Sequence, residues 1–483
     1  MNFRAVFYLL GRLFFIIGAL IMIPACVSFY YHDPLSMWTF LLTSGIALSI
    51  ALILVALCQK SRDEGIGIRE GFLLVTLSWC AVSLIGAVPY YLSFHFPSFI
   101  DAFFESVSGF TTTGASVLKS MEDLPRGLLF WRSFTQWIGG MGIIVFAIAV
   151  LPQLSVGGMQ LMKNEMPGPT FEQLKPRIKQ TALSLWKIYL LFSVLEVFLL
   201  CLFGMPLFES LCHMFSTVST GGFSPHTASV GFYQRPIFQY VIALFMFLAG
   251  INFVLHYAVL HGNFKKMFGD TEMKFYFGLT FVAFLVVAVD LALQNGQSWG
   301  LSFQQSLFQV ISITTTSGFV TADFDAWPHL SKGLLFLLMF VGGCAGSTGG
   351  GMKQVRLLLL FKMARQSVVQ HIFPKAIVSV KLNKRVIPEA ILHGVSSFFL
   401  IYIVIFSFCT LALLVYNIDF ITATSAVVAC LSNVGPGFGL VGAAQNYAFL
   451  PGLIKLLLCA CMIIGRLEIF TVLVLFFPAA WKR

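Results

Sequence analysis

The sequence predicts an all-α polytopic membrane protein, and three observations support this prediction. Of the 483 residues, 58% are hydrophobic and only 10% are charged, which lies outside the range of soluble globular domains. Apolar runs of bilayer-spanning length recur along the whole chain. Four shorter apolar segments end in small or hydroxyl-bearing residues followed by a glycine. Such a loop at membrane depth is stable only where it lines a water-filled path or is packed in protein.

Ten apolar stretches are predicted to cross the membrane as helices, because each has the length and hydropathy that a spanning helix needs. They cover roughly 5–30, 36–58, 70–94, 127–151, 182–204, 235–260, 274–294, 332–361, 390–416 and 450–477. The four short helices that precede the glycines lie between the later spans.

The formal net charge of +10 is concentrated in alternate loops and at both termini. The basic residues are Lys60, Arg62 and Arg69; Lys163, Lys175, Arg177 and Lys179; Lys265, Lys266 and Lys274; Lys353, Arg356, Lys362, Arg365, Lys375, Lys381, Lys384 and Arg385; and Arg4, Arg12, Lys482 and Arg483 at the ends. The positive-inside rule places these loops and both termini in the cytoplasm. The four glycine-ended segments then enter from the outside. Anionic lipids and an acidic cytosolic protein are better partners for such loops than nucleic acid.

An internal repeat organises the chain after residue 65. Each unit contains a span, a short pore helix, a glycine-ended loop and a second span. Residues 1–65 form an extra pair of transmembrane helices, and the units cover about 66–165, 175–265, 270–370 (with an interrupted second span) and 385–483. The fold class is therefore an extra N-terminal helix pair followed by four repeated units, each with a span, a pore helix, a filter loop and a second span.

The four loops have the composition of an alkali-cation filter. A helix about three turns long is predicted to begin near Asp101, Glu209, Gln305 and Thr422, thirteen residues before each glycine. Its C-terminus presents the negative end of the helix dipole to a cation, and a ring of carbonyl oxygens can replace a hydration shell. The alternative is that Gly, Ser and Thr only pack transmembrane helices closely. The predicted K⁺ ligand loops contain Thr112, Thr113, Gly114, Thr220, Gly221, Gly222, Thr316, Ser317, Gly318, Asn433, Val434 and Gly435.

The second loop has two adjacent glycines. Gly222 is favoured as the equivalent of the other loop glycines, because Gly222-Phe223 then aligns with Gly318-Phe319. Gly221 remains the alternative.

A glycine-rich segment interrupts the predicted span 332–361. It contains Gly342, Gly343, Gly346, Ser347, Thr348, Gly349, Gly350 and Gly351. So many glycines unwind a helix in mid-membrane and allow conformational change at low steric cost. A close-packed helix crossing is the alternative, and a phosphate-binding loop is excluded because Lys353 follows Met352 rather than glycine.

Arg466 lies within the apolar final span, and an intramembrane arginine is a functional hypothesis by default. The alternative is that it only pins helices together. Glu468 would face elsewhere on a straight helix and is expected to pair with another helix. Glu196, Asp290 and Lys455 are assigned interfacial or structural roles, and His213 is interpreted as a satisfied core histidine. The ten cysteines are scattered, without a C-x-x-C pair, and are interpreted as apolar fillers.

The chain resembles the Trk/Ktr/HKT superfamily of potassium transporters, most closely the membrane subunit of the bacterial Trk uptake system. The resemblance covers essentially the full length. It rests on Asp101-Ala-Phe-Phe-Glu-Ser with Thr-Thr-Thr-Gly114, Gln136-Trp-Ile-Gly-Gly-Met-Gly142, Gly157-Gly-Met-Gln160, Glu165-Met-Pro-Gly168, Gly342–Gly351 and Gly465-Arg-Leu-Glu468.

The resemblance implies a homodimer in the bacterial inner (plasma) membrane, with a pseudo-fourfold pore in each subunit and a cytosolic ring of TrkA-type nucleotide-binding subunits. Glycine at all four filter positions accompanies potassium preference in the superfamily, and serine at the first position accompanies sodium. The segment Gly342–Gly351 matches an intramembrane gate, and Arg466 matches an electrostatic barrier in the permeation path.

The predicted function is potassium uptake through this filter, without enzymatic activity. K⁺ is the transported ion, and no organic cofactor is expected in this chain. The main alternative is a K⁺/H⁺ or K⁺/Na⁺ symporter on the same scaffold, which would usually need a buried carboxylate or histidine in the path. A lipid-modifying enzyme would need His, Asp or Glu clustered at one membrane depth, and a non-transporting scaffold would not need four intact filter loops.

Overall fold

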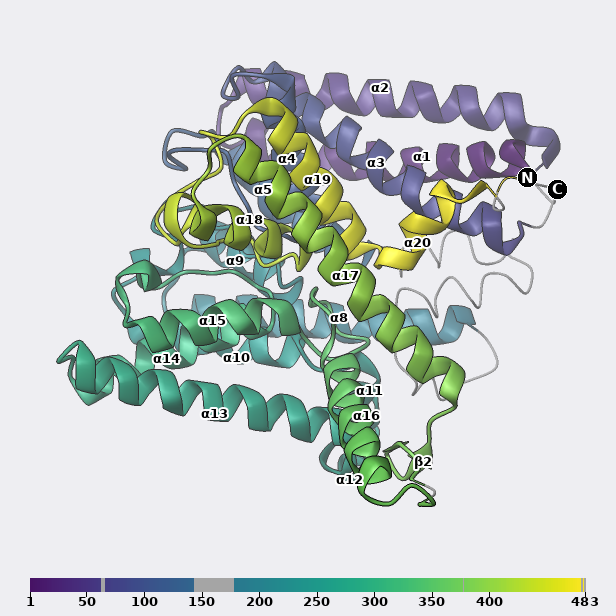
Figure 1. Cartoon of the computed structure of the whole chain (residues 1–483). Helices are drawn as coiled ribbons and strands as arrows, with labels where there is room; N and C mark the ends of the chain where they lie inside the picture. Colours follow the sequence, from purple (N-terminus) through teal and green to yellow (C-terminus); the bar gives the residue numbers. More distant parts are fainter. Residues whose placement is uncertain (62–65, 143–177, 377, 479–480, 482–483) are drawn as a thin grey trace.

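The computed structural model describes residues 1–61, 66–142, 178–376, 378–478 and 481, and these residues are almost all helical or in the loops between helices (Figure 1). The all-α polytopic membrane architecture predicted from the sequence is confirmed. The motifs at 157–160 and 165–168 lie outside the described residues, as do Arg62, Lys163, Lys175, Arg177, Lys482 and Arg483.

Six helices in the described part of the chain are long and apolar enough to cross a membrane. They are α1 (Phe3–Tyr30), α2 (Pro34–Cys58), α3 (Ile68–Leu92), α8 (Ile178–Leu202), α13 (Thr271–Gln294) and α17 (Glu389–Val415). The residues at the start of α2 explain why the helix begins there. Asp33 accepts a 3.2 Å hydrogen bond from the Ser36 amide, and Pro34 is the first helical residue. An aspartate cap followed by proline is a strong helix start.

Four short helices precede the glycines, as predicted. They are α4 (Phe99–Phe110), α9 (Leu207–Val218), α14 (Trp299–Thr314) and α18 (Phe420–Leu431). Three begin within two residues of the predicted positions, but α14 begins at Trp299, so Gln305 lies in its interior rather than at its start. Ser298 precedes α14 in an extended conformation, and the apolar residues that follow extend the helix by more than one turn.

Each short helix is followed by a second helix of its unit. These are α5 (Arg126–Gly140), α10 (Pro236–Ala249), α15 (His329–Val341) and α19 (Gly452–Arg466). They form a closed cycle with the short helices: α5 packs on α9, α10 on α14, α15 on α18, and α19 on α4. The last contact includes a 2.6 Å ion pair between Lys455 and Asp101. The cycle therefore joins α19 of the fourth unit to α4, the first short helix.

Two predicted spans are not single straight helices. The span 235–260 consists of α10 and α11 (Phe253–Leu260), bent by 100°, and the span 450–477 consists of α19 followed by Ile469–Phe476, bent by 115°. The first break contains Gly250, and Asn252 then caps α11 by accepting a 2.9 Å bond from the Val254 amide. Hydropathy alone could not locate these breaks, because both arms of each pair are apolar.

The span 332–361 is interrupted as predicted. Its two helices, α15 and α16 (Gln354–Ile372), are separated by the glycine-rich segment 342–353. In Figure 1, α16 runs across the direction of α13. The first part of the predicted span 127–151 is helix α5, and the residues after 142 lie outside the description.

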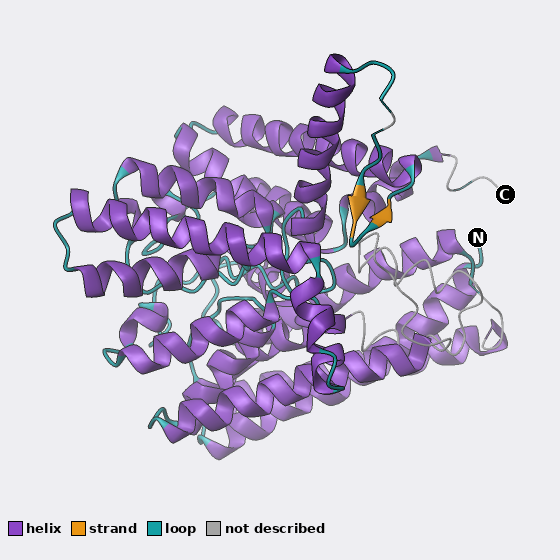
Figure 2. Ribbon diagram, turned by 90° about the horizontal axis from the view of Figure 1, so that it is seen from below, coloured by secondary structure: helices purple, strands orange, loops and turns teal. Residues whose placement is uncertain are grey.

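The remaining elements are short. They are α12 (Phe264–Gly269), α20 (Ile469–Leu473), the single-turn helices Gln59–Ser61, Ser229–Phe232, Phe324–Ala326, Gly439–Val441 and Val474–Phe476, and the strands β1 (Lys381–Leu382) and β2 (Arg385–Val386). The strands pair in antiparallel fashion through a turn with positive φ at Asn383 and Lys384, as two-residue hairpins require. Figure 2 shows this hairpin at the margin of the helical body.

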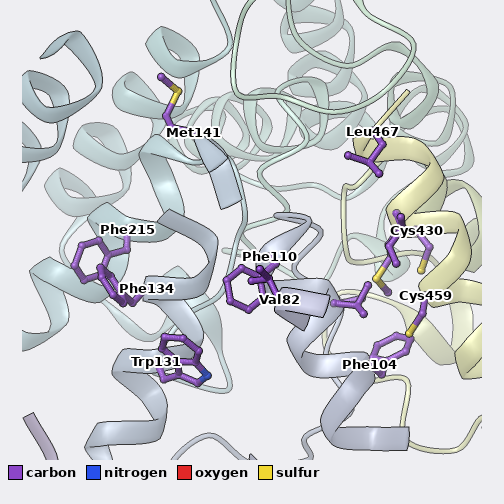
Figure 3. Packing of buried hydrophobic residues seen from close by; sticks show 14 of the residues in the cluster. Val82, Phe104, Phe110, Trp131, Phe134, Met141, Phe215, Cys430, Cys459 and Leu467 are labelled. Carbon is purple, nitrogen blue, oxygen red and sulfur yellow. The ribbon is translucent and has the colours of Figure 1, made fainter. Parts of the chain in front are cut away.

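Aromatic side chains fill the contact between α5 and α9. Phe134 lies 5.3 Å from Phe215 and 5.9 Å from Trp137, measured between ring centroids, and Trp131 lies 5.9 Å from Phe110 at the end of α4. Figure 3 shows Phe134 of α5 beside Phe215 of α9, with Trp131 close to them. Aromatic pairs add about 0.5–1.5 kcal/mol each beyond their buried area, so this cluster fixes the first two units against each other.

Both ends of the described chain lie at the same end of the molecule. The rings of Phe3 and Trp481 stack with centroids 6.4 Å apart.

Candidate ion pathway

The four glycine loops (111–115, 219–223, 315–319 and 432–436) share one backbone conformation. In each loop a non-glycine residue with positive φ is followed two residues later by a glycine with positive φ. The pairs are Thr112 (+54°) and Gly114 (+84°), Thr220 (+55°) and Gly222 (+80°), Thr316 (+62°) and Gly318 (+73°), and Asn433 (+57°) and Gly435 (+96°). Left-handed conformations at non-glycine residues store strain and cluster at functional sites. Gly221 does not share this conformation, so Gly222 is the structural equivalent of the other three glycines.

The four glycines form a closed ring of backbone contacts. A Cβ atom added to any of them would lie within 3.0 Å of the carbonyl oxygen that precedes the next loop's glycine. The contacts run from Gly114 to Gly221, from Gly222 to Ser317, from Gly318 to Val434, and from Gly435 to Thr113. Glycine is therefore required here for its conformation and for this close approach. The four loops surround one centre.

Two hollows flank this ring. One is lined by all four ring glycines, together with residues that follow them, among them Ala115, Phe223, Val320 and Pro436. The other is lined by Gly139, Gly140, Gly349, Gly350, Lys353, Arg466 and neighbouring residues. The glycine-rich segment and Arg466 thus belong to the second hollow.

A carboxylate joins the segments that follow the first two ring glycines. Glu122 accepts a 3.0 Å hydrogen bond from the Thr227 amide and a second bond from the Thr227 hydroxyl. Partial burial raises the pKa of Glu122, but these bonds outweigh it and lower the pKa to about 2. The Glu122 carboxylate, at the margin of the first hollow, is therefore ionised at neutral pH.

The glycine-rich segment 342–353 contacts the loops of the second and third units. Thr348 Oγ1 donates a 3.0 Å bond to the carbonyl oxygen of Val218, at the end of α9. The Gly350 amide donates a 2.6 Å bond to Oγ1 of Thr316. A Cβ at Gly350 would also collide with the Ser432 carbonyl oxygen. The segment is thus packed directly against the ends of three of the short helices or the glycine loops that follow them.

Arg466 connects three units. It is the last residue of α19 rather than the interior residue of a straight span, because the helix bends immediately after it. Its Nη1 donates a 2.7 Å bond to the Thr348 carbonyl oxygen, and its Nη2 donates bonds of 2.9 and 3.0 Å to the carbonyl oxygens of Gly139 and Gly140. The guanidinium therefore ties α19 to the glycine-rich segment and to the end of α5.

Positive charge dominates the second hollow. Lys353 Nζ donates to the Gly349 carbonyl oxygen, beside Arg466. Among the described residues that line this hollow, Glu468 is the one acid. It pairs with Arg356 on α16, in line with the expectation that it pairs with another helix.

A buried ion pair behind the loops was missed by the sequence analysis. Arg132 Nη2 lies 2.7 Å from Glu105 Oε1, and the arginine also donates a 3.2 Å bond to the Ser224 carbonyl oxygen. Glu105 accepts a 3.0 Å bond from the Val117 amide. The pair thus links the first two glycine loops. Arg132 lies in a predicted span, so its charge was the available signal.

The remaining ionisable residues that the sequence analysis placed in or near spans are held by contacts within the protein or are buried. Asp290 accepts a 3.0 Å bond from the Ser331 amide at the start of α15, and Lys455 forms the ion pair with Asp101. His213 is buried and lies 3.2 Å from the Tyr233 hydroxyl. Glu196 is fully buried in α8. The structural interpretation agrees with the contacts of Asp290 and Lys455. His213 is not fully satisfied, because its buried Nδ1 has no hydrogen-bond partner among the described residues.

Known proteins resemble this chain over its whole length. The TrkH family, described as cation transport protein, matches residues 39–482. The chain is 41% identical to the Trk system potassium uptake protein TrkH of Salmonella typhimurium, with 100% of both chains covered. It is 36% identical to the Trk system potassium uptake protein TrkG of Escherichia coli, with 99% of both covered. The crystal structure of the potassium transporter TrkH from Vibrio parahaemolyticus matches with a TM-score of 0.90 at 35% identity, covering 100% of both chains. By sequence and by fold, this chain belongs to the TrkH family of cation transport proteins.

Proposed function

We propose that this chain takes up K⁺ across the bacterial inner membrane through a filter made by its four glycine loops. The ion-binding loops are those of Thr112, Thr113 and Gly114; Thr220, Gly221 and Gly222; Thr316, Ser317 and Gly318; and Asn433, Val434 and Gly435. The closed ring of glycine-to-carbonyl contacts carries this proposal. The relatives named as potassium uptake proteins support the choice of ion.

The physical basis is the replacement of the K⁺ hydration shell by protein oxygens. The four pore helices end at residues 110, 218, 314 and 431, immediately before the loops. The negative ends of their dipoles therefore lie close to the proposed ion path. The four pore units proposed at 66–165, 175–265, 270–370 and 385–483 each contribute one loop.

The segment Gly342–Gly351 is proposed as the gate and Arg466 as an electrostatic barrier beneath the filter. The contacts of Arg466 to Thr348, Gly139 and Gly140 hold the segment in its present position. The helix α16 follows the segment directly and carries part of the basic run 353–385. A cytosolic nucleotide-binding ring acting on this run would move the gate through α16. We further propose a homodimer with cytoplasmic termini, embedded among anionic lipids.

The test is uptake of radioactive Rb⁺ into liposomes that contain the purified protein, with K⁺ and Na⁺ as competitors. Arg466→Ala is measured in parallel, because it removes the proposed barrier and permits flux without the cytosolic ring. Leu400→Ala, at an exposed position on α17, is the control. Uptake blocked by K⁺ and spared by Na⁺ is expected. Equal block by both ions, or no uptake by either protein, would refute a potassium-selective path.

The symporter alternative is tested in the same liposomes. An imposed pH or Na⁺ gradient should leave the Rb⁺ uptake unchanged in a channel-like path. Uptake that requires either gradient would establish coupling, and Glu196, Asp290 and His213 would then be the residues to vary.

A further inference from the structure

The second glycine loop lacks a hydrogen bond between two of its own side-chain hydroxyls, here called the brace, that two of the other loops contain. In the first loop, the hydroxyl oxygens of Thr111 and Thr113 are hydrogen-bonded at 2.7 Å. In the third loop, Thr315 and Ser317 form the same bond at 2.8 Å. The second loop has Ser219 at the first position but Gly221 at the other. A glycine has no hydroxyl, so this loop cannot brace itself.

Gln136 of α5 occupies the place of the missing brace. Its Nε2 donates a 2.7 Å hydrogen bond to the Gly221 carbonyl oxygen, and its Oε1 accepts a 3.0 Å bond from the Phe223 amide. The residue is completely buried. One side chain thus holds the backbone on both sides of Gly222.

The absence of a side chain at Gly221 makes room for this amide. A Cβ atom at residue 221 would lie within 3.0 Å of three Gln136 side-chain atoms. The double glycine in the second loop therefore has two separate causes. Gly222 serves the ring of the four loops, and Gly221 accommodates Gln136.

The carbonyl that Gln136 holds is itself part of the ring, because Gly114 packs against the Gly221 oxygen. Rotation of this peptide would change the spacing between the first and second loops. A filter distinguishes K⁺ from Na⁺ through the number and position of its oxygen ligands. Losing the two hydrogen bonds would leave buried polar groups unpaired and free this peptide to rotate.

We propose that Gln136 is a positioning residue that sets ion selectivity by holding the Gly221 carbonyl and the Phe223 amide. This inference rests on the proposed filter function. Gln136 acts through the backbone of the second loop and does not itself contact the ion.

The first variant is Gln136→Met, which keeps the side-chain length but cannot form either hydrogen bond. The matched control is Gln239→Met on α10, another buried glutamine on the second helix of a unit, which bonds to Gln304 at 2.8 Å. Rb⁺ uptake into liposomes is measured with K⁺ or Na⁺ as competitor and normalised to monodisperse protein. We expect Gln136→Met to reduce the K⁺-over-Na⁺ ratio about tenfold, as loss of one typical net hydrogen bond would, and Gln239→Met to leave it unchanged.

The second variant combines Gln136→Ala with Gly221→Ser. The shortened residue makes room for the serine, whose hydroxyl can bond to Ser219 as Ser317 bonds to Thr315. This double variant should recover most of the lost selectivity. Recovery would distinguish a positioning role from a general packing role, because the double variant has lost more packing volume at residue 136 than Gln136→Met.

The outcomes separate the inference from the proposed function. A wild-type protein that fails to discriminate K⁺ from Na⁺ would overturn both. A selective wild type with an unchanged ratio in Gln136→Met would overturn this inference alone. If Gln136→Met fails to fold, a folded and selective double variant supports the inference, and a double variant that also fails to fold rejects it in favour of a purely structural role.

Discussion

Asn433 Nδ2 donates a 2.9 Å hydrogen bond to Thr113 Oγ1, and this bond joins the last glycine loop to the first. The same nitrogen lies 3.0 Å from the Met462 carbonyl oxygen on α19. The equivalent position in the other loops is threonine, whose shorter side chain could not make both contacts. The fourth loop therefore has asparagine in place of threonine at the position where it contacts the first loop and closes the ring.

We predict that Asn433→Thr lowers stability, because the amide contacts to Thr113 and Met462 are buried and would be lost. Loss of such contacts costs about 1–3 kcal/mol. The measurement is thermal unfolding of the detergent-solubilised protein. An unchanged melting temperature would show that the fourth loop is held by other contacts, such as the 2.7 Å bond from the Tyr447 hydroxyl to the Gly435 carbonyl oxygen.

Gly114→Ser is expected to lower the selectivity for K⁺ over Na⁺. Gly114 has a φ of +84°, and any Cβ would displace the neighbouring Gly221 carbonyl. Competition of K⁺ and Na⁺ with Rb⁺ uptake provides the measurement. Gly333→Ser is the control, since a Cβ at Gly333 would meet no atom within 4 Å. Unchanged selectivity in Gly114→Ser would remove Gly114 from the filter.

Arg466→Ala should increase Rb⁺ flux. The substitution removes a positive charge from the second hollow and releases the Thr348 carbonyl from its 2.7 Å bond. Arg235→Ala, at an exposed arginine before α10, should leave the flux unchanged. Loss of folded protein in Arg466→Ala alone would instead support the interpretation that this arginine only pins helices together.

Arg132→Met should destabilise the protein strongly, because Glu105 would remain as a buried carboxylate without its partner. Breaking a buried ion pair in this way costs about 3–5 kcal/mol. Adding Glu105→Gln should restore part of the loss, since no unpaired charge then remains. Melting temperatures of the single and double variants test this coupling. A double variant less stable than Arg132→Met would contradict it.

Local sequence signals predicted the elements that depend on local chemistry. The apolar run predicted at 36–58 forms α2 (Pro34–Cys58), and the run Gly342–Gly351 breaks the predicted span 332–361. Hydropathy and glycine content are properties of short stretches of sequence, so the elements that depend on them can be predicted without knowing the fold. The early start of α14 at Trp299 was missed because the start was predicted from a fixed distance to Gly318 and not from the residues of the helix itself.

Contacts between distant segments could not be predicted in this way. The bends after Ala249 and Arg466 lie inside apolar stretches. A Cβ atom added at Gly250 would collide with Thr315, and one added at Gly465 would collide with the Leu431 carbonyl oxygen. These glycines are required by helices from other parts of the chain. Nothing in their immediate sequence distinguishes them from glycines that pack a straight helix.

The sequence by itself determined the all-helical membrane architecture and the four glycine-ended segments, because hydropathy, composition and glycine placement are properties of the chain. Only the tertiary structure decided that Gly222 rather than Gly221 matches the other ring glycines, and that Gln136 holds the loop around it. The physical reason is that φ angles and carbonyl contacts at Gly222 depend on Ser317 in the next unit and on α5 in the previous one. These relationships exist only once the four units are closed into a ring.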